Sequence, residues 1–255
     1  MVPAPSNPSS APRPVVLVTG AARRIGRAIT LHLAAHGWDV VLHHRSSAAD
    51  VEATAAEARA LGAQAWLVAA DLADEAACNA LVPAAVAQAG RLDAVVNNAS
   101  LFTYDDVASY NGPNAERHFR ANTTPAVLLA RALHAHLAAR GAQGCVVNLL
   151  DQKLVNPNPD YFSYTLSKAA LAEATVMLAQ ALAPVLRVCG ISPGVTLVSG
   201  PMDEAEFAAA HRLTPLQRSS TPDDIAGVVK FLCGPDSAYM TWQLITVDGG
   251  VLNSS

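Results

Sequence analysis

The stretch that decides the fold reads Val15-Val16-Leu17-Val18-Thr19-Gly20-Ala21-Ala22-Arg23-Arg24-Ile25-Gly26. Its first residues are apolar and mostly β-branched, which indicates a buried strand, and the glycine that follows indicates a turn. Ile25, Ile29 and Leu33 then recur at the spacing of one helix face, and Gly37 follows where a left-handed residue ends a helix. The stretch therefore predicts a strand that turns sharply into a helix.

Outward from this unit, short strand-like runs alternate with alanine-rich helical segments as far as residue 247. The strand candidates are residues 15–19, 39–43, 64–69, 94–97, 144–149, 186–191 and 244–247. Most are apolar throughout, as strands covered on both faces are. We therefore expect an α/β fold over residues 15–255: a single doubly wound, Rossmann-type domain with a seven-stranded parallel sheet flanked by helices.

Two helical segments between these strands contain residues that typically start or end a helix. A helix is expected to open at Asp50 and to end at Gly62. Residues 116–140 are long enough for one extended helix, which Pro125 either starts or kinks.

The composition excludes several classes of protein. The chain has 255 residues, of which 51 % are hydrophobic and 15 % charged, and its formal net charge is −4. A disordered chain would be less hydrophobic and more charged, and a nucleic-acid-binding protein of this size usually carries a basic surplus. No apolar run approaches the ~20 residues of a membrane span. We expect one large domain that contacts neither nucleic acid nor membrane.

The cysteines and the first residues indicate the compartment. The four cysteines lie far apart without C-x-x-C spacing, so we expect reduced, buried thiols and no metal site. Residues 1–14 are rich in Pro, Ser and Ala and lack the anatomy of a signal peptide. They are expected to form a disordered tail on a cytoplasmic protein.

The turn after the first strand is suited to a dinucleotide. A strand, a glycine turn and a helix N-terminus aim unpaired N–H groups at an anion, and Gly20 and Gly26 let a pyrophosphate approach the backbone. Arg24 replaces the central glycine of the usual fingerprint, so its guanidinium is expected beside the phosphates or the ring above them, with Ile25 next to it.

The end of the second strand indicates which dinucleotide binds. An acidic residue there would bind the 2′-hydroxyl of NAD, but the chain has His44-Arg45-Ser46. A cation and a hydroxyl suit a 2′-phosphate instead. The cofactor prediction is therefore NADP(H), in its reduced form NADPH.

A tyrosine and a lysine provide candidate acid chemistry. Tyr164 and Lys168 lie at i, i+4 and share one helix face. An ammonium a few ångströms from a phenol favours the phenolate, so we expect Lys168 to lower the pKa of Tyr164 and make it a competent proton donor.

Five motifs in this order carry a resemblance. They are Thr19-Gly20 with Gly26, Asn97-Asn98-Ala99, Tyr164-x-x-x-Lys168, Ser192-Pro193-Gly194 and Val247-Asp248-Gly249-Gly250. From Val15 onward the chain resembles the short-chain dehydrogenase/reductase family. That resemblance implies a nicotinamide cofactor and, commonly, a homotetramer.

The resemblance also implies roles for single residues. Asn122, Tyr164 and Lys168 match the family's catalytic residues, and its lysine also holds the nicotinamide ribose. Further cofactor contacts are expected at Asp71, Leu72, Asn98, Ala99, Ser100, Pro193, Gly194 and Thr196.

One catalytic position departs from the family pattern. Thirteen residues before the tyrosine the family has a serine, and this chain has Asp151. A serine hydroxyl stabilises a carbonyl oxygen that takes up hydride, whereas a carboxylate repels the developing alkoxide unless it is protonated. If the acceptor is a C=N bond, its nitrogen needs a proton, and an aspartate bonded to Tyr164 can help deliver one. Asp151 therefore favours imine reduction over carbonyl reduction.

Within the family, the chain most resembles the pteridine reductases. The shared features are Arg24, His44-Arg45-Ser46, Asp151 and the run Asn98-Ala99-Ser100-Leu101-Phe102. The resemblance implies that Phe102 stacks on a flat pterin and that Ser100 and Arg24 contact the pterin or the cofactor phosphates. Tyr164, with Asp151, would protonate the ring nitrogen beside the carbon that receives hydride.

The implied product is a tetrahydropterin, formed from dihydrobiopterin, dihydromonapterin or dihydrofolate. Two alternatives stay open: an NADPH-dependent carbonyl (ketone) reductase of the same family, and a non-catalytic NADP(H)-binding sensor. Residues 195–214, where the regular pattern fails, are the expected substrate loop.

Overall fold

Strand β1 (Val15–Val18) lies inside a seven-stranded sheet in the computed structural model, which describes residues 12–198 and 214–250. The strand order is β3-β2-β1-β4-β5-β6-β7, and every neighbouring pair is parallel. The other strands are β2 (Asp39–His44), β3 (Ala65–Ala69), β4 (Ala94–Asn97), β5 (Gly144–Leu149), β6 (Leu186–Pro193) and β7 (Leu244–Val247). The order reverses between β1 and β4, and in parallel sheets ligands bind at the carboxyl end of such a reversal.

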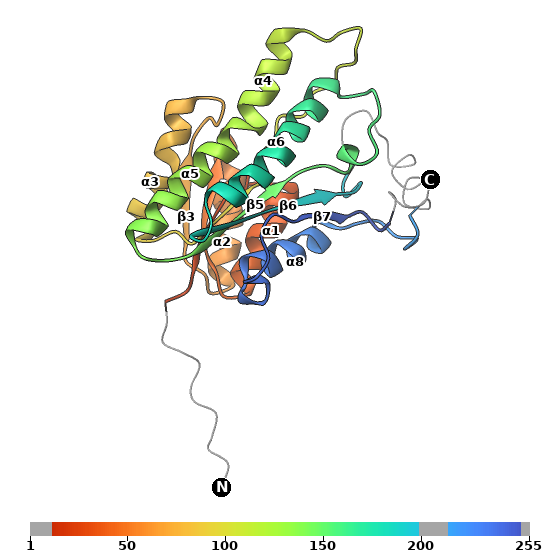
Figure 1. Cartoon of the computed structure of the whole chain (residues 1–255). Helices are drawn as coiled ribbons and strands as arrows, with labels where there is room; N and C mark the ends of the chain where they lie inside the picture. The colour runs from red at the N-terminus through yellow and green to blue at the C-terminus, as the bar shows by residue number, and fades with distance from the viewer. Residues whose placement is uncertain (1–11, 199–213, 251–255) are drawn as a thin grey trace.

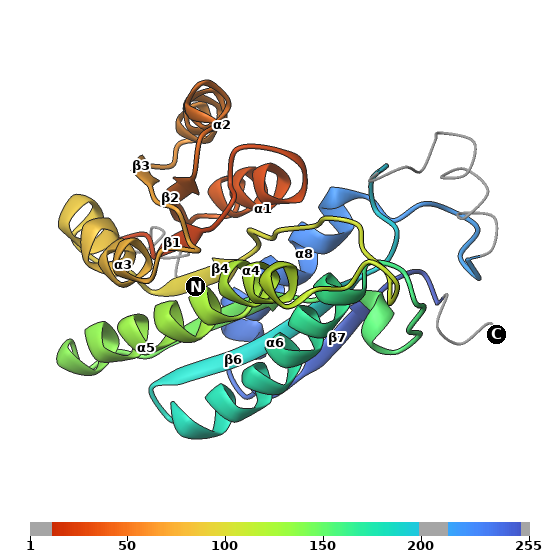
Figure 2. The same cartoon turned by 90° about the horizontal axis from the view of Figure 1, so that it is seen from above.

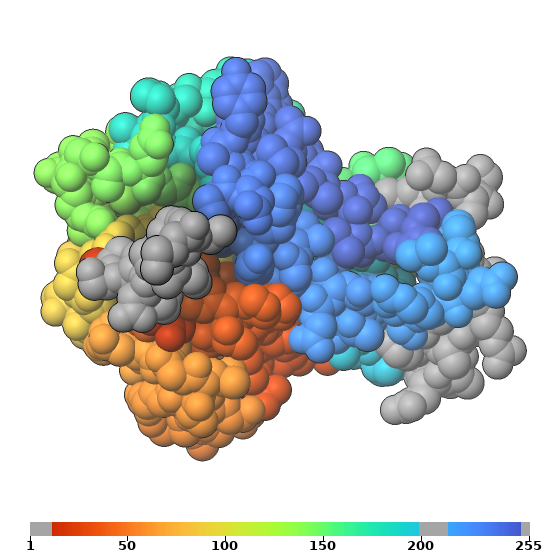
Figure 3. Space-filling view, turned by 90° about the horizontal axis from the view of Figure 1, so that it is seen from below, coloured from red at the N-terminus to blue at the C-terminus, as the bar shows by residue number. Residues whose placement is uncertain are grey.

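Helices cover both faces of the sheet (Figures 1 and 2). One layer holds α1 (Arg24–Ala35), α2 (Ala48–Ala60) and α8 (Pro222–Cys233), which lie side by side in the view from below (Figure 3). The other holds α3 (Glu75–Ala89), α4 (Gly112–Asn122), α5 (Thr124–Ala139) and α6 (Phe162–Ala181). Two short 3-10 helices complete the described elements, η1 (Gln152–Leu154) and η2 (Pro235–Ser237).

Two apolar cores result from the alternation of side chains along the strands. Val16 and Val18 pack into the core that also contains Ile29 of α1. Leu17 points to the opposite face and packs into the core that contains Leu133 of α5. The sheet is thereby held from both sides, which fixes the edge where its strands end.

The observed elements confirm the expected doubly wound sheet, with small shifts at the ends of strands. Strand β3 begins one residue later than expected, at Ala65, and β6 continues to Pro193. Helix α2 begins at Ala48, so the expectation that it opens at Asp50 is wrong by two residues. The four cysteines are free and buried, as expected.

The segment expected as one extended helix forms two. Helix α4 ends at Asn122, and α5 begins at Thr124 with Pro125 in its first turn. Proline has no N–H for the preceding turn, and its ring clashes with that turn's carbonyl, so it starts a helix rather than continuing one. The break places Asn122 at the end of α4, beside α6.

Two expectations fall largely outside the described residues: the tail 1–14, of which 12–14 are described, and the substrate loop 195–214, of which 195–198 and 214 are described. Within the described ranges, no helix combines the length and the hydropathy needed to cross a bilayer.

Candidate active site

The turn after β1 has the backbone that the sequence predicts. Gly20 has a φ of +63°, which favours glycine, and a Cβ on Gly26 would lie 2.1 Å from the carbonyl oxygen of Gly20. Both glycines are therefore required by the close approach of the turn to the first helix. Arg24, with a φ of +54°, begins α1, and its guanidinium donates to the carbonyl of Val198 at 3.0 Å.

The ends of β1 and β4 are tied together next to this turn. The hydroxyl of Thr19 accepts hydrogen bonds from the backbone N–H groups of Asn98 at 2.9 Å and Ala99 at 3.0 Å. The side-chain amide of Asn98 donates back to the carbonyls of Thr19 at 2.9 Å and Gly20 at 3.2 Å. Sequence reasoning assigned Asn98 to the cofactor; in this structure it holds the shape of the glycine turn.

The end of β2 contributes a buried histidine that sequence reasoning missed. His43 Nδ1 accepts the N–H of Gly20 at 3.2 Å, and its Nε2 lies 3.1 Å from the carbonyl of Ala70. Burial lowers the pKa of His43 to about 4, so the ring is neutral at pH 7 with its proton on Nε2. The imidazole thereby fastens the glycine turn to the ends of β2 and β3.

The residues predicted to bind the 2′-phosphate, His44-Arg45-Ser46, come directly after His43 in the chain. Arg45 and Ser46 are exposed, and His44 Nδ1 is a buried atom without a hydrogen-bond partner. Beyond β3, the predicted contacts Asp71 and Leu72 are exposed and buried, respectively.

Tyr164 and Asp151 meet as the sequence predicts. The phenol of Tyr164, in the first turn of α6, donates to Oδ2 of Asp151 at 2.7 Å. The other carboxylate oxygen of Asp151 accepts the N–H of Lys153 at 2.8 Å and caps η1. Lys168, one turn beyond Tyr164, is buried and donates to the carbonyl of Leu149 at 2.6 Å.

The expected direction of the pKa shift of Tyr164 is wrong. Burial and the neighbouring carboxylate of Asp151 raise the pKa of Tyr164 well above 10. Burial also lowers the pKa of Lys168 to about 8, although Asp151 acts in the opposite direction. The ammonium lies 5.7 Å from the centre of the phenol ring and binds a carbonyl, so it does not offset the carboxylate that touches the hydroxyl. Tyr164 consequently holds its proton in this state of the site.

Asn122 joins three parts of the site. Its side-chain oxygen accepts the N–H of Leu101 at 2.7 Å and the hydroxyl of Ser100 at 3.2 Å. Its side-chain nitrogen donates to the carbonyl of Leu101 at 3.0 Å and to the hydroxyl of Ser167 at 2.9 Å. Asn122 therefore fixes the segment after β4, which carries Ser100, against α6, which carries Tyr164.

Phe102 is held in a group of aromatic rings. It stacks on Tyr161 with ring centroids 4.2 Å apart and an interplanar angle of 8°. It meets Tyr164 edge to face, with 4.6 Å between centroids. Tyr161, which sequence reasoning missed, precedes α6 with a φ of +52°. Neither its spacing nor its neighbours in the sequence signal this role.

The end of β6 lies beside the end of β7. The N–H of Gly194 donates to the carbonyl of Val247 at 2.9 Å, and a Cβ on Gly194 would lie 2.8 Å from the Cα of Asp248. Thr196 donates to the carbonyl of Gly194 at 2.9 Å. Gly194, Thr196 and the neighbouring Pro193 therefore have a compact backbone at the carboxyl edge of the sheet. Within the described ranges, no group of three or more His, Cys, Asp or Glu side chains could hold a metal ion.

Comparison with known proteins places this site in a family. A family model described as enoyl-(acyl carrier protein) reductase matches residues 20–252. Pteridine reductase 1 of Leishmania tarentolae is 34 % identical, over 93 % of this chain and 96 % of that protein. L-rhamnose 1-dehydrogenase (NAD(P)(+)) of a Sphingomonas species is 30 % identical, over 92 % and 95 %.

A solved structure has the same architecture. FolM alternative dihydrofolate reductase 1 from Brucella suis, in complex with NADP, is 39 % identical and superposes with a TM-score of 0.89 over 95 % of this chain and 96 % of that one. The family model spans Gly20, Gly26, Tyr164 and Lys168. This chain is an oxidoreductase that belongs to the short-chain dehydrogenase/reductase family.

Proposed function

We propose that this protein is an NADPH-dependent reductase that transfers hydride to a C=N bond of a dihydropterin and releases a tetrahydropterin. The observation that carries the proposal is the 2.7 Å hydrogen bond from the phenol of Tyr164 to Asp151. It joins two groups that can hold a proton, at the position where a carbonyl reductase of this family has a serine.

The charge at this position favours nitrogen as the acceptor atom. Hydride addition to a ketone leaves an alkoxide, which a neighbouring carboxylate repels. A C=N nitrogen is more basic than a carbonyl oxygen, so it can take a proton as the hydride arrives and no anion is left beside the carboxylate. The Tyr164–Asp151 pair can supply that proton, so Asp151 assists imine reduction and opposes carbonyl reduction.

The residues present fit NADPH. The left-handed Gly20 and the contact that excludes a side chain at Gly26 leave the backbone free to approach a pyrophosphate. At the end of β2, His44 Nδ1 is buried without a partner, and the next residue, Arg45, is exposed. An unpaired buried nitrogen and an arginine that follows it in the chain suit a 2′-phosphate, which supplies the missing acceptor. The NADP complex of the similar Brucella suis protein supports the same cofactor.

Separate side chains of the protein donate the proton, stabilise the phenolate and hold the site in shape. When bound, NADPH supplies the hydride. Tyr164 gives its proton to the ring nitrogen next to the carbon that is reduced, and a proton from solvent, passed along the Tyr164–Asp151 hydrogen bond, restores the phenol. Lys168, whose ammonium lies 5.7 Å from the phenol ring, stabilises the transient phenolate and is placed to hold the nicotinamide ribose. Asn122 keeps Ser100 and Leu101 in place through four hydrogen bonds with its side chain, including that to Ser167.

Phe102 is suited to bind a flat ring. It is 37 % exposed, although one of its faces is covered by Tyr161. A pterin stacked on Phe102 would lie next to Tyr164, which Phe102 already contacts at its edge. The similar proteins named pteridine reductase and alternative dihydrofolate reductase support this substrate class.

Carbonyl reduction is the second candidate. Sugar and acetoin dehydrogenases match this chain at 30 % and 26 % identity, respectively. The two functions separate in an assay of NADPH oxidation with dihydropterins and ketones side by side. Turnover of a dihydropterin that is lost in Tyr164→Phe supports pterin reduction, whereas turnover of ketones alone supports the second candidate.

We also propose that the protein works in the cytoplasm as a homotetramer, as the family resemblance implies. Sedimentation equilibrium measures the assembly directly. A mass near 26.5 kDa rather than about four times that value would contradict the tetramer.

A further inference from the structure

The segment after β4 carries a buried carboxylate that the mechanism above does not use. Asp105 is 3 % exposed. Its Oδ1 accepts the backbone N–H of Ser163 at 2.9 Å, and its Oδ2 accepts the hydroxyl of Ser163 and, at 3.1 Å, the side-chain amide of Asn114. Its backbone carbonyl also accepts the N–H of Phe162 at 3.1 Å.

These contacts replace a missing helix cap. Tyr161 stands at the N-cap of α6 in a left-handed conformation and makes no side-chain cap, and the first turn of α6 contains no acidic residue. Asp105 lies 58 residues before Ser163 in the chain and supplies both the acceptor and the negative charge at this helix end. The cap is thus tertiary: it joins the segment after β4 to the turn that carries Tyr164.

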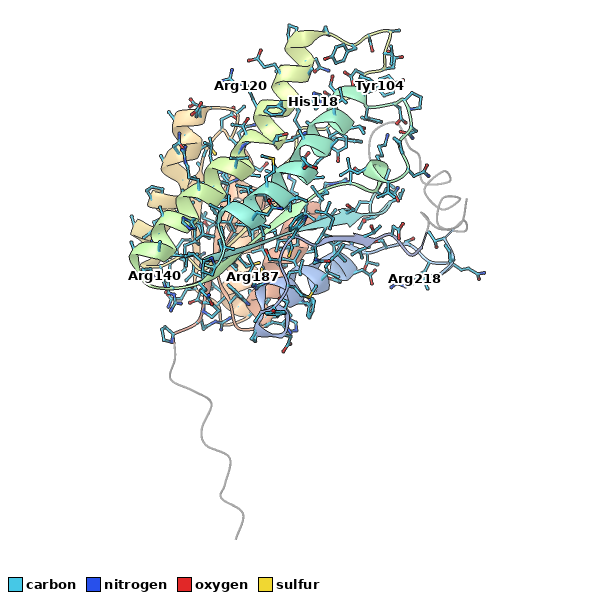
Figure 4. The ribbon with its side chains drawn as sticks, in the orientation of Figure 1. Tyr104, His118, Arg120, Arg140, Arg187 and Arg218 are labelled. Carbon is cyan, nitrogen blue, oxygen red and sulfur yellow. The ribbon has the colours of Figure 1, made fainter. Side chains whose placement is uncertain are left out.

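The same segment is anchored on both sides of Phe102. On one side, Leu101 is held by Asn122 through its N–H at 2.7 Å and its carbonyl at 3.0 Å. On the other, the hydroxyl of Thr103 lies 3.1 Å from Nε2 of His118 on α4. Figure 4 shows His118 and Tyr104 at the end of the molecule where α4 and α6 begin. Phe102 therefore sits between fixed points; Asn122 and Asp105 both reach α6, and Asp105 bonds Ser163, the residue next to Tyr164.

We infer that Asp105 is a positioning residue that sets the distance between the stacking face of Phe102 and the proton donor Tyr164. It acts through Ser163, the residue next to Tyr164, and touches neither substrate nor cofactor. The inference rests on the proposed function, because the distance matters only if a flat substrate lies on Phe102 while Tyr164 protonates it.

The test compares Asp105→Ala with Asp105→Asn and with the matched control Asp106→Ala. Asp106 is the next residue and bonds with Ser109 in its own exposed turn. For Asp105→Ala, kcat/KM for the dihydropterin is expected to fall about 100-fold, as misplacement of about 1 Å does, while the Kd for NADPH changes little. Asp105→Asn retains an acceptor for the N–H of Ser163 and is expected to restore most of the loss, and Asp106→Ala is expected to match the wild type.

A double-mutant cycle separates positioning from general support of the fold. If Asp105 acts through the Phe102–Tyr164 distance, Asp105→Ala costs little further activity once Phe102→Ala has removed the stacking face. Fully additive losses would overturn the inference, as would an Asp105→Ala enzyme with wild-type kcat and KM.

A second variant keeps the test open if Asp105→Ala does not fold. Ser163→Ala removes the hydroxyl contact and leaves the backbone contact, so we expect a smaller loss in the same kinetic constants. Wild-type kinetic constants in Ser163→Ala would then overturn the inference. If the wild-type enzyme turns over no dihydropterin, the proposed function fails instead, which the wild-type assay reports before any variant is made.

Discussion

The phenol of Tyr164 donates a 2.7 Å hydrogen bond to the carboxylate of Asp151, which stands directly beyond the end of β5. Burial and this contact raise the pKa of Tyr164, and the phenol proton points at the carboxylate. The carboxylate touches the hydroxyl, whereas the ammonium of Lys168 lies 5.7 Å from the centre of the phenol ring. The hydrogen-bonded pair therefore holds a proton that the reduction of a C=N bond can use.

Asp151→Ser is expected to change the preferred substrate. Removal of the carboxylate takes away one of the two proton-holding groups, so kcat/KM for dihydropterins should fall about 100-fold or more, as for loss of a general acid. The new hydroxyl can stabilise a carbonyl oxygen, so slow reduction of ketones should appear. Steady-state rates on both substrate classes check this, with Asp236→Ser in the exposed η2 turn as control. An unchanged preference would mean that Asp151 does not select the acceptor atom.

Lys168 predicts an alkaline limit to activity. Its pKa of about 8 means that the ammonium is present below that pH and is lost as pH rises through it. Since the charged form stabilises the phenolate, kcat should decline above about pH 8 in the wild type. Lys168→Arg keeps its charge to higher pH and should move this limit upward while lowering the maximum rate. A wild-type profile that is flat from pH 7 to 10 would show that the charge of Lys168 is not needed.

The doubly wound sheet and most of its strand boundaries were predictable because buried parallel strands are continuous apolar runs, such as Val15–Val18. Gly20, Gly26, Tyr164 and Lys168 were predictable because their chemistry depends on local spacing. The meeting of Asp151 with Tyr164 followed from a family pattern, in which one substituted residue stood out.

The missed residues depend on contacts between distant parts of the chain. His43 matters because it reaches Gly20 and Ala70, and Asp105 because it reaches Ser163. No spacing rule connects such pairs. The predicted direction of the pKa shift of Tyr164 was wrong for the same reason. That direction depends on which charge lies nearer in space, and the sequence shows only that Lys168 is one turn away.

His43 should make the fold sensitive to acid. Its pKa is about 4 in the folded protein and near 6.5 when unfolded, so the unfolded chain binds more protons between these values. The contribution of His43 to the free energy of unfolding is therefore fully present above about pH 6.5. It is lost as pH falls toward 4, by about 3 kcal/mol in all. Urea unfolding at pH 7 and pH 4.5 measures the difference. His43→Gln should be less stable at pH 7 but lose less on acidification; an equal loss in both proteins would contradict this role.

Phe102→Leu should weaken binding of the substrate more than of the cofactor. Stacking is worth about 0.5–1.5 kcal/mol beyond buried area, so KM for a dihydropterin should rise about 2- to 13-fold. Phe119→Leu, at a half-exposed position on α4 outside the aromatic group, provides the control. Equal effects of the two substitutions would remove Phe102 from the substrate site.

The most direct test of the account is NADPH oxidation, followed by absorbance, with 7,8-dihydrobiopterin, dihydromonapterin, dihydrofolate and several ketones, in the wild type and in Tyr164→Phe. We expect turnover of at least one dihydropterin, its loss in Tyr164→Phe, and an unchanged Kd for NADPH in that variant. Turnover of ketones alone, or NADPH binding without turnover of any substrate, would contradict it.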